Sequence, residues 1–124
     1  MKKHILVVED DKTLLEAISF RLKTEGYEVE TAESGWEALE IITGKKIDLI
    51  ISDIMMPNIS GLSLLSMINR FYHERIPVIM ISSLDRANVI VSAMGLGAND
   101  FMTKPLDFKK LIDKIKKIFF SGKR

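Results

Sequence analysis

The chain has 124 residues, of which 47% are hydrophobic and 28% are charged, and its formal net charge is +1. This length and composition are typical of one globular domain with a sizeable core, and the near-neutral charge gives no bulk attraction to nucleic acid or to an anionic membrane. The sequence contains no cysteine, which excludes disulfides and thiol chemistry, and no apolar stretch approaches the roughly 20 residues that span a bilayer. We therefore expect a cytoplasmic protein that does not enter the membrane.

Strand-like and helix-like segments alternate along the whole chain. Short apolar runs, mostly of β-branched residues, predict strands over 5–8, 27–31, 47–52, 76–81 and 99–102. Apolar residues at helical spacing predict helices over 12–25, 35–44, 60–72, 86–96 and 107–120. Trp36 lies in the second of these helices, and we expect its ring to pack there. The segment 27–31 alternates polar and apolar residues, which indicates a strand at an edge of the sheet.

Five successive strand–helix units predict an α/β fold with a parallel sheet and right-handed crossovers. The flavodoxin-like, doubly wound (βα)5 arrangement with strand order 2-1-3-4-5 suits the pattern best, because it places 27–31 at an edge and the first and third strands side by side. We expect one domain over 1–120, with 121–124 as a tail or the start of a linker.

Residues that can handle phosphate or a metal ion follow four of the five apolar runs. They are Glu9, Asp10 and Asp11 after the first run, Asp53 after the third, Ser82 and Ser83 after the fourth, and Lys104 after the fifth. Ligands of an open parallel sheet bind outside the carboxyl ends of the strands, near the point where the strand order reverses. Any one of these acids could simply cap a helix or face solvent, but the four loops together indicate a common site.

The expected neighbours Glu9, Asp10 and Asp53 form a set of oxygen ligands without histidine or cysteine. Such a set suits Mg²⁺, with Mn²⁺ as a possible substitute, and a divalent cation offsets the repulsion between the carboxylates. Lys104 would add a positive point charge for a phosphoryl oxygen, and Ser82 a hydroxyl donor. The residues alone therefore predict a site for a metal ion and a phosphoryl group.

These residues stand in motifs that resemble the receiver domain of two-component response regulators, the CheY-like family. The motifs are Ile5-Leu6-Val7-Val8-Glu9-Asp10-Asp11, Asp53-Ile54-Met55-Met56-Pro57 with Gly61, Ser82-Ser83, and Gly97-Ala98-Asn99-Asp100-Phe101 with Lys104-Pro105. The resemblance extends to about residue 120. It implies that Asp53 accepts a phosphoryl group from a histidine kinase or a phosphotransfer protein.

The same resemblance implies a role for each residue near the phosphoacceptor. Asp10, Asp53 and the backbone carbonyl of Met55 would bind Mg²⁺, Glu9 would act largely through water, and Asp11 would not be a ligand. Residues that would line the phosphoryl pocket are Met55, Met56, Ser83 and Leu84. We hypothesise that the bulky Met55 and Leu84 restrict water and slow self-dephosphorylation.

Ser82 and Phe101 resemble the family's switch pair, in which the hydroxyl follows the phosphoryl group and the ring turns inward. This movement would alter the face formed by the helix over 86–96, the strand of Phe101 and the last helix, and so signal to a partner or an output domain. The last helix carries Lys110 where winged-helix regulators usually have an acid, and the preceding helix carries the apolar run 89–91, so their dimer is not expected. The lysines of the last helix are interpreted as a solvated face, not a nucleic-acid site.

Other functions remain as alternatives. A Mg²⁺-dependent phosphatase with an aspartyl nucleophile usually has a second aspartate two residues after the first, and this chain has Met55 there. A flavin-binding protein would need a hydroxyl-rich phosphate loop where Glu9, Asp10 and Asp11 stand. A pseudo-receiver that never handles phosphate would not need Asp53 and Lys104. We expect a phosphoacceptor switch that catalyses only its own phosphorylation and dephosphorylation.

Overall fold

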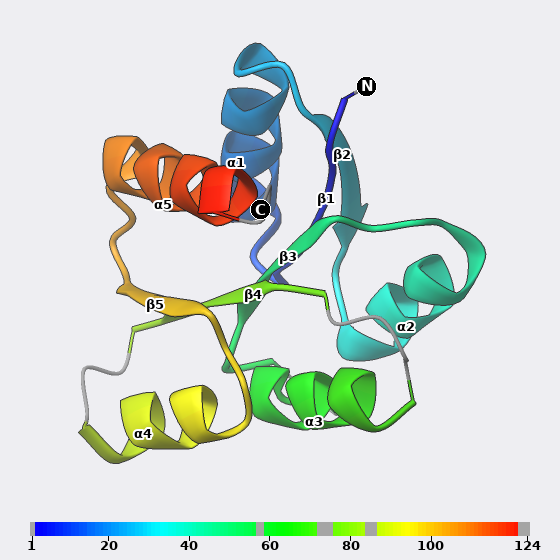
Figure 1. Cartoon of the computed structure of the whole chain (residues 1–124), viewed down its shortest axis with the longest axis vertical. Helices are drawn as coiled ribbons and strands as arrows, with labels where there is room; N and C mark the ends of the chain where they lie inside the picture. Colours follow the sequence, from blue (N-terminus) through cyan, green and yellow to red (C-terminus); the bar gives the residue numbers. More distant parts are fainter. Residues whose placement is uncertain (1, 57–58, 72–75, 84–86, 122–124) are drawn as a thin grey trace.

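The computed structural model, shown in Figure 1, describes residues 2–56, 59–71, 76–83 and 87–121. The strands in this part of the chain are β1 (His4–Val8), β2 (Glu28–Ala32), β3 (Leu49–Asp53), β4 (Val78–Ser82) and β5 (Asp100–Thr103). The helices are α1 (Lys12–Thr24), α2 (Gly35–Gly44), α3 (Gly61–Phe71), α4 (Ala87–Gly95) and α5 (Phe108–Ser121).

The strands form one parallel sheet with the order β2-β1-β3-β4-β5, which confirms the predicted flavodoxin-like (βα)5 topology. Helices α1 and α5 cover one face of the sheet, and α2, α3 and α4 cover the other (Figure 1). The strand order reverses between β1 and β3, so the loops that follow these two strands lie next to each other. The fold favours a binding site at this carboxyl end of the strands.

The hydrophobic core has two layers because side chains on a strand point alternately to the two faces. Leu6 and Val8 of β1 pack toward α2, α3 and α4, whereas Ile5 and Val7 pack toward α1 and α5. All four side chains are at most 1% exposed, as expected for a central strand covered on both faces. Their nearly continuous apolar sequence follows from this double burial.

Local capping chemistry fixes where the first two helices begin. The Asp11 side chain accepts hydrogen bonds from the backbone N–H groups of Thr13 and Leu14 at the start of α1, and Ser34 accepts one from Glu37 at the start of α2. After α1 the chain turns at Gly26, whose φ of 97° is costly for residues with a side chain. The capping side chains of Asp11 and Ser34 therefore fix the first turns of α1 and α2, shortly after β1 and β2.

The predicted elements are all present, but several bounds shift by one or two residues. Strand β3 begins at Leu49 and includes Asp53 as its last residue, and β5 ends at Thr103. The interpretation of Trp36 was wrong: its side chain is 58% exposed, because α2 turns Ala38 and Ile42 toward the sheet instead. In α4, Val91 is 68% exposed, which agrees with the expectation that the run 89–91 cannot all face inward.

The edge strand β2 carries a series of ion pairs. They are Lys2 with Glu28 at 3.6 Å, Lys45 with Glu30 at 2.7 Å, and Lys12 with Glu33 at 4.0 Å. The acids belong to β2 or to the residue just after it, and the lysines come from the N-terminal segment, from the end of α2 and from the start of α1. The position of β2 at the edge confirms the prediction made from its alternating sequence.

Candidate functional site

The carboxyl ends of β1 and β3 bring three carboxylates together. Val8 of β1 pairs in register with Ser52 of β3, so Glu9 and Asp10 follow one strand beside Asp53 on its neighbour. One oxygen atom from each of Glu9, Asp10 and Asp53 lies within 4.8 Å of the other two. Glu9 and Asp53 are 1% and 3% exposed, whereas Asp10 is exposed to solvent. The sequence prediction that these three acids meet is confirmed.

Lys104 closes this acidic cluster from the far side of β4. Its ammonium donates a hydrogen bond of 2.9 Å to Oδ2 of Asp53 and lies 3.3 Å from Oε1 of Glu9. The Lys104 backbone N–H also donates to the carbonyl of Ser82, at 2.9 Å, and the Lys104–Pro105 peptide bond is cis. The loop is therefore held to β4 by its backbone while its side chain reaches two strands across the sheet.

The Glu9 carboxylate is the most electrostatically strained group of the site. Its Oε2 accepts a hydrogen bond from the Asp11 backbone N–H at 3.1 Å, but its buried Oε1 accepts none from the residues that the structure describes. Burial disfavours the charged form, and the neighbouring charge of Asp53 adds to this effect, so the pKa of Glu9 rises from 4.5 to about 7. Lys104 opposes this rise without cancelling it. An additional cation would stabilise the ionised carboxylate.

The same cluster stabilises the charged form of Lys104, whereas it destabilises the charged form of Glu9. Burial of its ammonium favours loss of the proton, but the hydrogen bond and the charge of Asp53, together with Glu9, outweigh burial and raise the pKa of Lys104 above its ordinary value. Lys104 therefore keeps its positive charge at neutral pH. It provides a fixed cation next to the oxygen of Asp53 that faces it.

The segment after β3 holds the Asp53 carboxylate in a defined orientation. The backbone N–H of Met55 donates to Oδ1 of Asp53 at 3.1 Å, while Lys104 binds Oδ2. The next backbone groups are fixed too, because Ile54 donates to the carbonyl of Ile81 at 2.9 Å and accepts from Gly61 at 2.8 Å. The Met55 side chain is 57% exposed above this segment. Each Asp53 oxygen thus accepts a hydrogen bond from a different loop, Oδ1 from Met55 and Oδ2 from Lys104.

The site fits a hard divalent cation. The donor set consists of carboxylate oxygens only, as Mg²⁺ prefers, and Oε1 of Glu9 is a buried acceptor without a hydrogen-bond donor among the described residues. Lys104 supplies only one positive charge against Glu9, Asp10 and Asp53. The chemistry of the residues therefore agrees with the predicted magnesium site.

Other predicted site residues lie in different environments. Ser82 ends β4 and is 0% exposed, and Ser83 after it is exposed. Met56 is buried and belongs to the core layer on the face of the sheet covered by α2, α3 and α4. Phe101 is half-buried on β5. Pro57, which belongs to the motif after Asp53, and Leu84, which the resemblance assigns to the phosphoryl pocket, lie outside the described residues.

Asp11 does not point into the acidic cluster. Its Oδ1 caps α1 by accepting from Thr13 at 3.0 Å and from Leu14 at 3.2 Å. That Asp11 is not a metal ligand stays a prediction. Its backbone nevertheless contributes to the site, because the Asp11 N–H is the donor that holds Oε2 of Glu9.

Two residues beside Asp53 were not identified from the sequence as positioning groups. Ser52 is buried and its hydroxyl donates to the carbonyl of Asp53 at 3.0 Å. Gly61, identified in the sequence only as part of the motif after Asp53, lies so close that a Cβ atom on it would be 2.3 Å from the same carbonyl oxygen. A serine inside an otherwise apolar strand was the one available signal for the first. The second depends on a close approach that no sequence pattern shows.

Comparisons with known proteins agree with this fold and site. The family model of the response regulator receiver domain matches residues 5–116. Over 104 residues the chain is 39% identical to the transcriptional regulatory protein GlrR of Escherichia coli, a match that covers 84% of this chain and 23% of that protein. The chain thus spans about a quarter of the length of this curated relative.

Solved structures show the same similarity over almost the whole chain. A CheY-like receiver domain protein from Methanospirillum hungatei is 30% identical, with a TM-score of 0.91 and coverage of 98% of this chain and 96% of that chain. The response regulator TrrA from Thermotoga maritima, solved in complex with Mg(2+)-BeF, is 35% identical, with a TM-score of 0.82 and coverage of 93% and 97%. With its strand order, its acidic cluster and these similarities, the chain belongs to the response regulator receiver domain family.

Proposed function

We propose that this chain is a phosphorylation-activated switch in which Asp53 accepts a phosphoryl group from a histidine kinase or a phosphotransfer protein. The observation that carries the proposal is the geometry around one carboxylate. Oδ2 of Asp53 accepts a hydrogen bond of 2.9 Å from Lys104, and Glu9 and Asp10 each bring an oxygen within 4.8 Å. Receiver-domain membership supports the general role.

Asp10, Asp53 and the backbone carbonyl of Met55 would hold Mg²⁺, or Mn²⁺ in its place, with Glu9 acting largely through water. The bound cation would neutralise charge on the transferring group and orient it toward Asp53. Oε1 of Glu9 is buried and has the Lys104 ammonium at 3.3 Å but no hydrogen-bond donor among the described residues, which supports a second cation near this oxygen. Both metals prefer oxygen ligands of the kind found here.

Phosphoryl transfer needs a correctly placed oxygen nucleophile. A carboxylate oxygen of Asp53 forms a bond to phosphorus while the phosphorus–nitrogen bond of the donor phosphohistidine breaks, and the departing imidazole takes up a proton. Lys104 balances the negative charge of the phosphoryl oxygens. The donors on Oδ1 and Oδ2 keep Asp53 in place before the reaction, so most of the catalytic effect comes from positioning and electrostatics.

Ser82 and Phe101 are the proposed switch residues. Ser82 ends β4 directly after Ile81, the residue paired in register with Asp53, and it is fully buried, which supports a role close to the phosphoacceptor. Phe101 is half-buried on β5 and packs against the core beside α4. Because the ring is still partly exposed, an inward rotation would bury more of it and would change the face formed by α4, β5 and α5.

The output of this switch depends on partners. A histidine kinase or a phosphotransfer protein would supply the phosphoryl group, and an output domain or a separate protein would read the α4–β5–α5 face. GlrR is named as a transcriptional regulator, and this chain matches 23% of it, so nucleic-acid binding by a longer protein would come from other parts. None of the described helices is long and apolar enough to cross a membrane.

The alternatives receive less support from the site. Sustained phosphatase activity would require an acid–base group near the phosphoacceptor, and the exposed side chain two residues later is the thioether of Met55. A pseudo-receiver would not need a lysine bound to Asp53 at 2.9 Å. We therefore propose a phosphoacceptor switch that catalyses its own phosphorylation and dephosphorylation and no multiple-turnover reaction on a foreign substrate.

Incubation with acetyl phosphate and Mg²⁺, followed by intact mass measurement, tests the proposal. We expect one added phosphoryl group in the wild type and none in Asp53→Asn. Reduction of the adduct with borohydride should convert residue 53 to homoserine, which peptide mapping detects.

Asp11→Asn is the matched control, because it also removes one carboxylate from these loops while asparagine still caps α1. This variant should be phosphorylated like the wild type. A wild type that never gains the adduct, or an adduct on Asp53→Asn, would contradict the assignment.

A further inference from the structure

A single row of side chains crosses the sheet just below the phosphoacceptor. Ser52 of β3 pairs in register with Met80 of β4, and Met80 pairs with Phe101 of β5. Residues paired in a parallel sheet point to the same face, so these three side chains lie side by side on the face covered by α3 and α4. Met80 stands between the strand of Asp53 and the strand of Phe101.

The three side chains differ in how tightly they are held. Met80 is 0% exposed and Ser52 is 1% exposed, whereas Phe101 is half-buried and packs against the same hydrophobic cluster as Met80. The Ser52 hydroxyl donates to the carbonyl of Asp53 at 3.0 Å. Ser52, at one end of the row, is therefore hydrogen-bonded to the backbone of the phosphoacceptor.

Gly61, the first residue of α3, joins Met80 to the same carbonyl. A Cβ atom at this position would lie 2.3 Å from the Asp53 carbonyl oxygen and 2.7 Å from Cε of Met80. The thioether methyl group thus packs onto the backbone of Gly61, next to the Asp53 carbonyl. No side chain separates them, because glycine has none to place there.

We infer that Met80 is a positioning residue that couples the backbone of Asp53 to the ring of Phe101. The inference rests on the proposed function, since it concerns how phosphorylation of Asp53 would reach Phe101. Adjacent strands are about 4.8 Å apart, so Asp53 and Phe101, two strands apart, communicate through what lies on β4. Met80 packs onto Gly61 next to the Asp53 carbonyl, and it is paired in register with Phe101 on β5.

The chemical nature of methionine suits this role. Its unbranched thioether changes rotamer at low cost, so the methyl group can move when the Asp53 carbonyl shifts or when the Phe101 ring enters the row. A branched side chain of similar volume would fill the same space but resist that adjustment. Met80 is therefore expected to matter for coupling more than for stability.

The test measures the response of Phe101 to a phosphoryl mimic. The full chain is labelled with fluorophenylalanine, and the Phe101 signal among the six phenylalanines is assigned with Phe101→Leu. Beryllofluoride with Mg²⁺ is then added, and the fluorine NMR shift of Phe101 is recorded. In Met80→Leu we expect the shift to fall to about half of the wild-type value or less. Its adduct with acetyl phosphate should still form.

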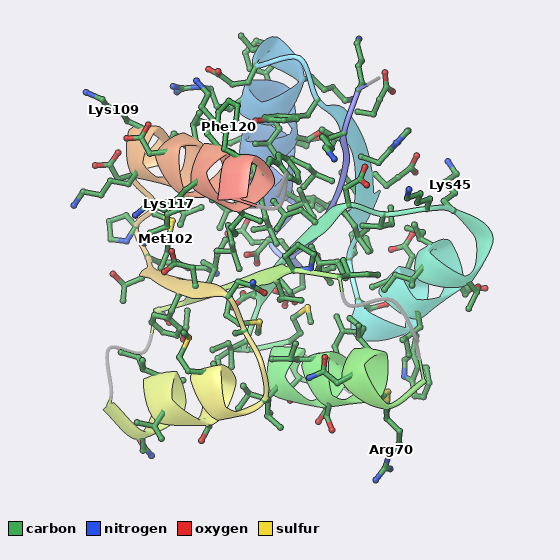
Figure 2. The ribbon with its side chains drawn as sticks, viewed as in Figure 1. Lys45, Arg70, Met102, Lys109, Lys117 and Phe120 are labelled. Carbon is green, nitrogen blue, oxygen red and sulfur yellow. The ribbon has the colours of Figure 1, made fainter. Side chains whose placement is uncertain are left out.

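Met102→Leu is the matched control. Met102 is buried on β5 directly after Phe101, but it points to the other face of the sheet, between β5 and α5 (Figure 2). The same substitution there should leave the Phe101 response at the wild-type value. Each variant should lose less than about 1.5 kcal/mol of stability, which urea unfolding checks. Met80→Ile provides a second stiff variant if Met80→Leu does not fold.

The outcomes separate the inference from the proposed function. An unchanged Phe101 response in a folded Met80→Leu variant would overturn the inference and leave the proposed function intact. An equal loss in Met102→Leu would also overturn it, because the effect would then be a general loosening of the core. A wild type that neither gains a phosphoryl group nor responds to beryllofluoride would overturn the proposed function itself.

Discussion

At the scale of single residues, the site is governed by the imbalance between three carboxylates and one ammonium group. Glu9 is the residue that bears this imbalance, because it is buried and only one of its two oxygens accepts a hydrogen bond from the described residues. Asp10 can share its charge with solvent, and Asp53 has donors on both oxygens. The protonation of Glu9 should therefore respond to pH and to metal.

The raised pKa of Glu9 predicts a pH-dependent stability in the absence of divalent cations. Glu9 is protonated in both states below pH 4.5, whereas between 4.5 and about 7 the unfolded chain releases this proton first. The folded state then binds more protons than the unfolded state, so the free energy of unfolding falls as pH rises through this window. The loss is at most about 3 kcal/mol. Urea unfolding in EDTA at pH 5 and pH 8 measures it.

Glu9→Gln is the control for this effect, because it cannot ionise and should remove this part of the pH dependence. Saturating Mg²⁺ at pH 8 should restore stability to the wild type, because the cation binds the folded state and offsets the charge of the ionised Glu9. The prediction fails if wild type and Glu9→Gln show the same slope between pH 5 and pH 8 in EDTA.

At the scale of secondary-structure elements, the start of α1 shapes the loop of the site that precedes it. Asp11 illustrates this most clearly, since its side chain caps α1 and its backbone N–H holds Glu9. The segment between β1 and α1 is only three residues long, so a change in the cap is transmitted to the carboxylate cluster.

Asp11→Ala should therefore lower the free energy of unfolding by about 1 kcal/mol, because two backbone N–H groups of α1 lose their acceptor. Asp11→Asn should stay within a few tenths of a kcal/mol of the wild type, since asparagine caps almost equally well. Urea unfolding at pH 7 compares the three proteins. An equal loss in both variants would show that the charge of Asp11, and not its capping, stabilises α1.

The sequence was sufficient to predict the elements and their order, because each strand of the sheet has its own pattern. The buried strands read as continuous apolar runs and β2 alternates, which placed it at the edge. Convergence of Glu9, Asp53 and Lys104 followed from the topology alone. Element bounds were less certain, since Asp53 joins β3 through backbone hydrogen bonds that a polar side chain does not reveal.

Features that depend on close packing could not be predicted. The exposure of Trp36 reflects the rotation of α2 on the sheet, which pairs Ala38 and Ile42 with the core instead. The contact of Gly61 with the Asp53 carbonyl depends on how α3 docks. The raised pKa of Glu9 depends on its burial. Each of these features depends on how segments remote in sequence pack against one another.

At the scale of the whole molecule, stability should decrease from the centre of the sheet toward its edges. Strands β1 and β3 are paired on both sides and buried on both faces, whereas β2 has one paired side and exposed residues. Amide hydrogens of Leu6 and Ile51 should therefore exchange at least about tenfold more slowly than those paired at β2. Native-state hydrogen exchange followed by NMR measures this. Slower exchange in β2 than in β3 would contradict the predicted gradient.

The ion pairs along β2 have a consequence for how the molecule meets others of its kind. An exposed edge strand offers unpaired backbone groups to any approaching strand, and Glu28 and Glu30 with their lysine partners stand beside that edge. A sixth strand would have to displace or dehydrate these charged pairs before it could bond. The β2 edge of the sheet is therefore protected against the addition of a further strand.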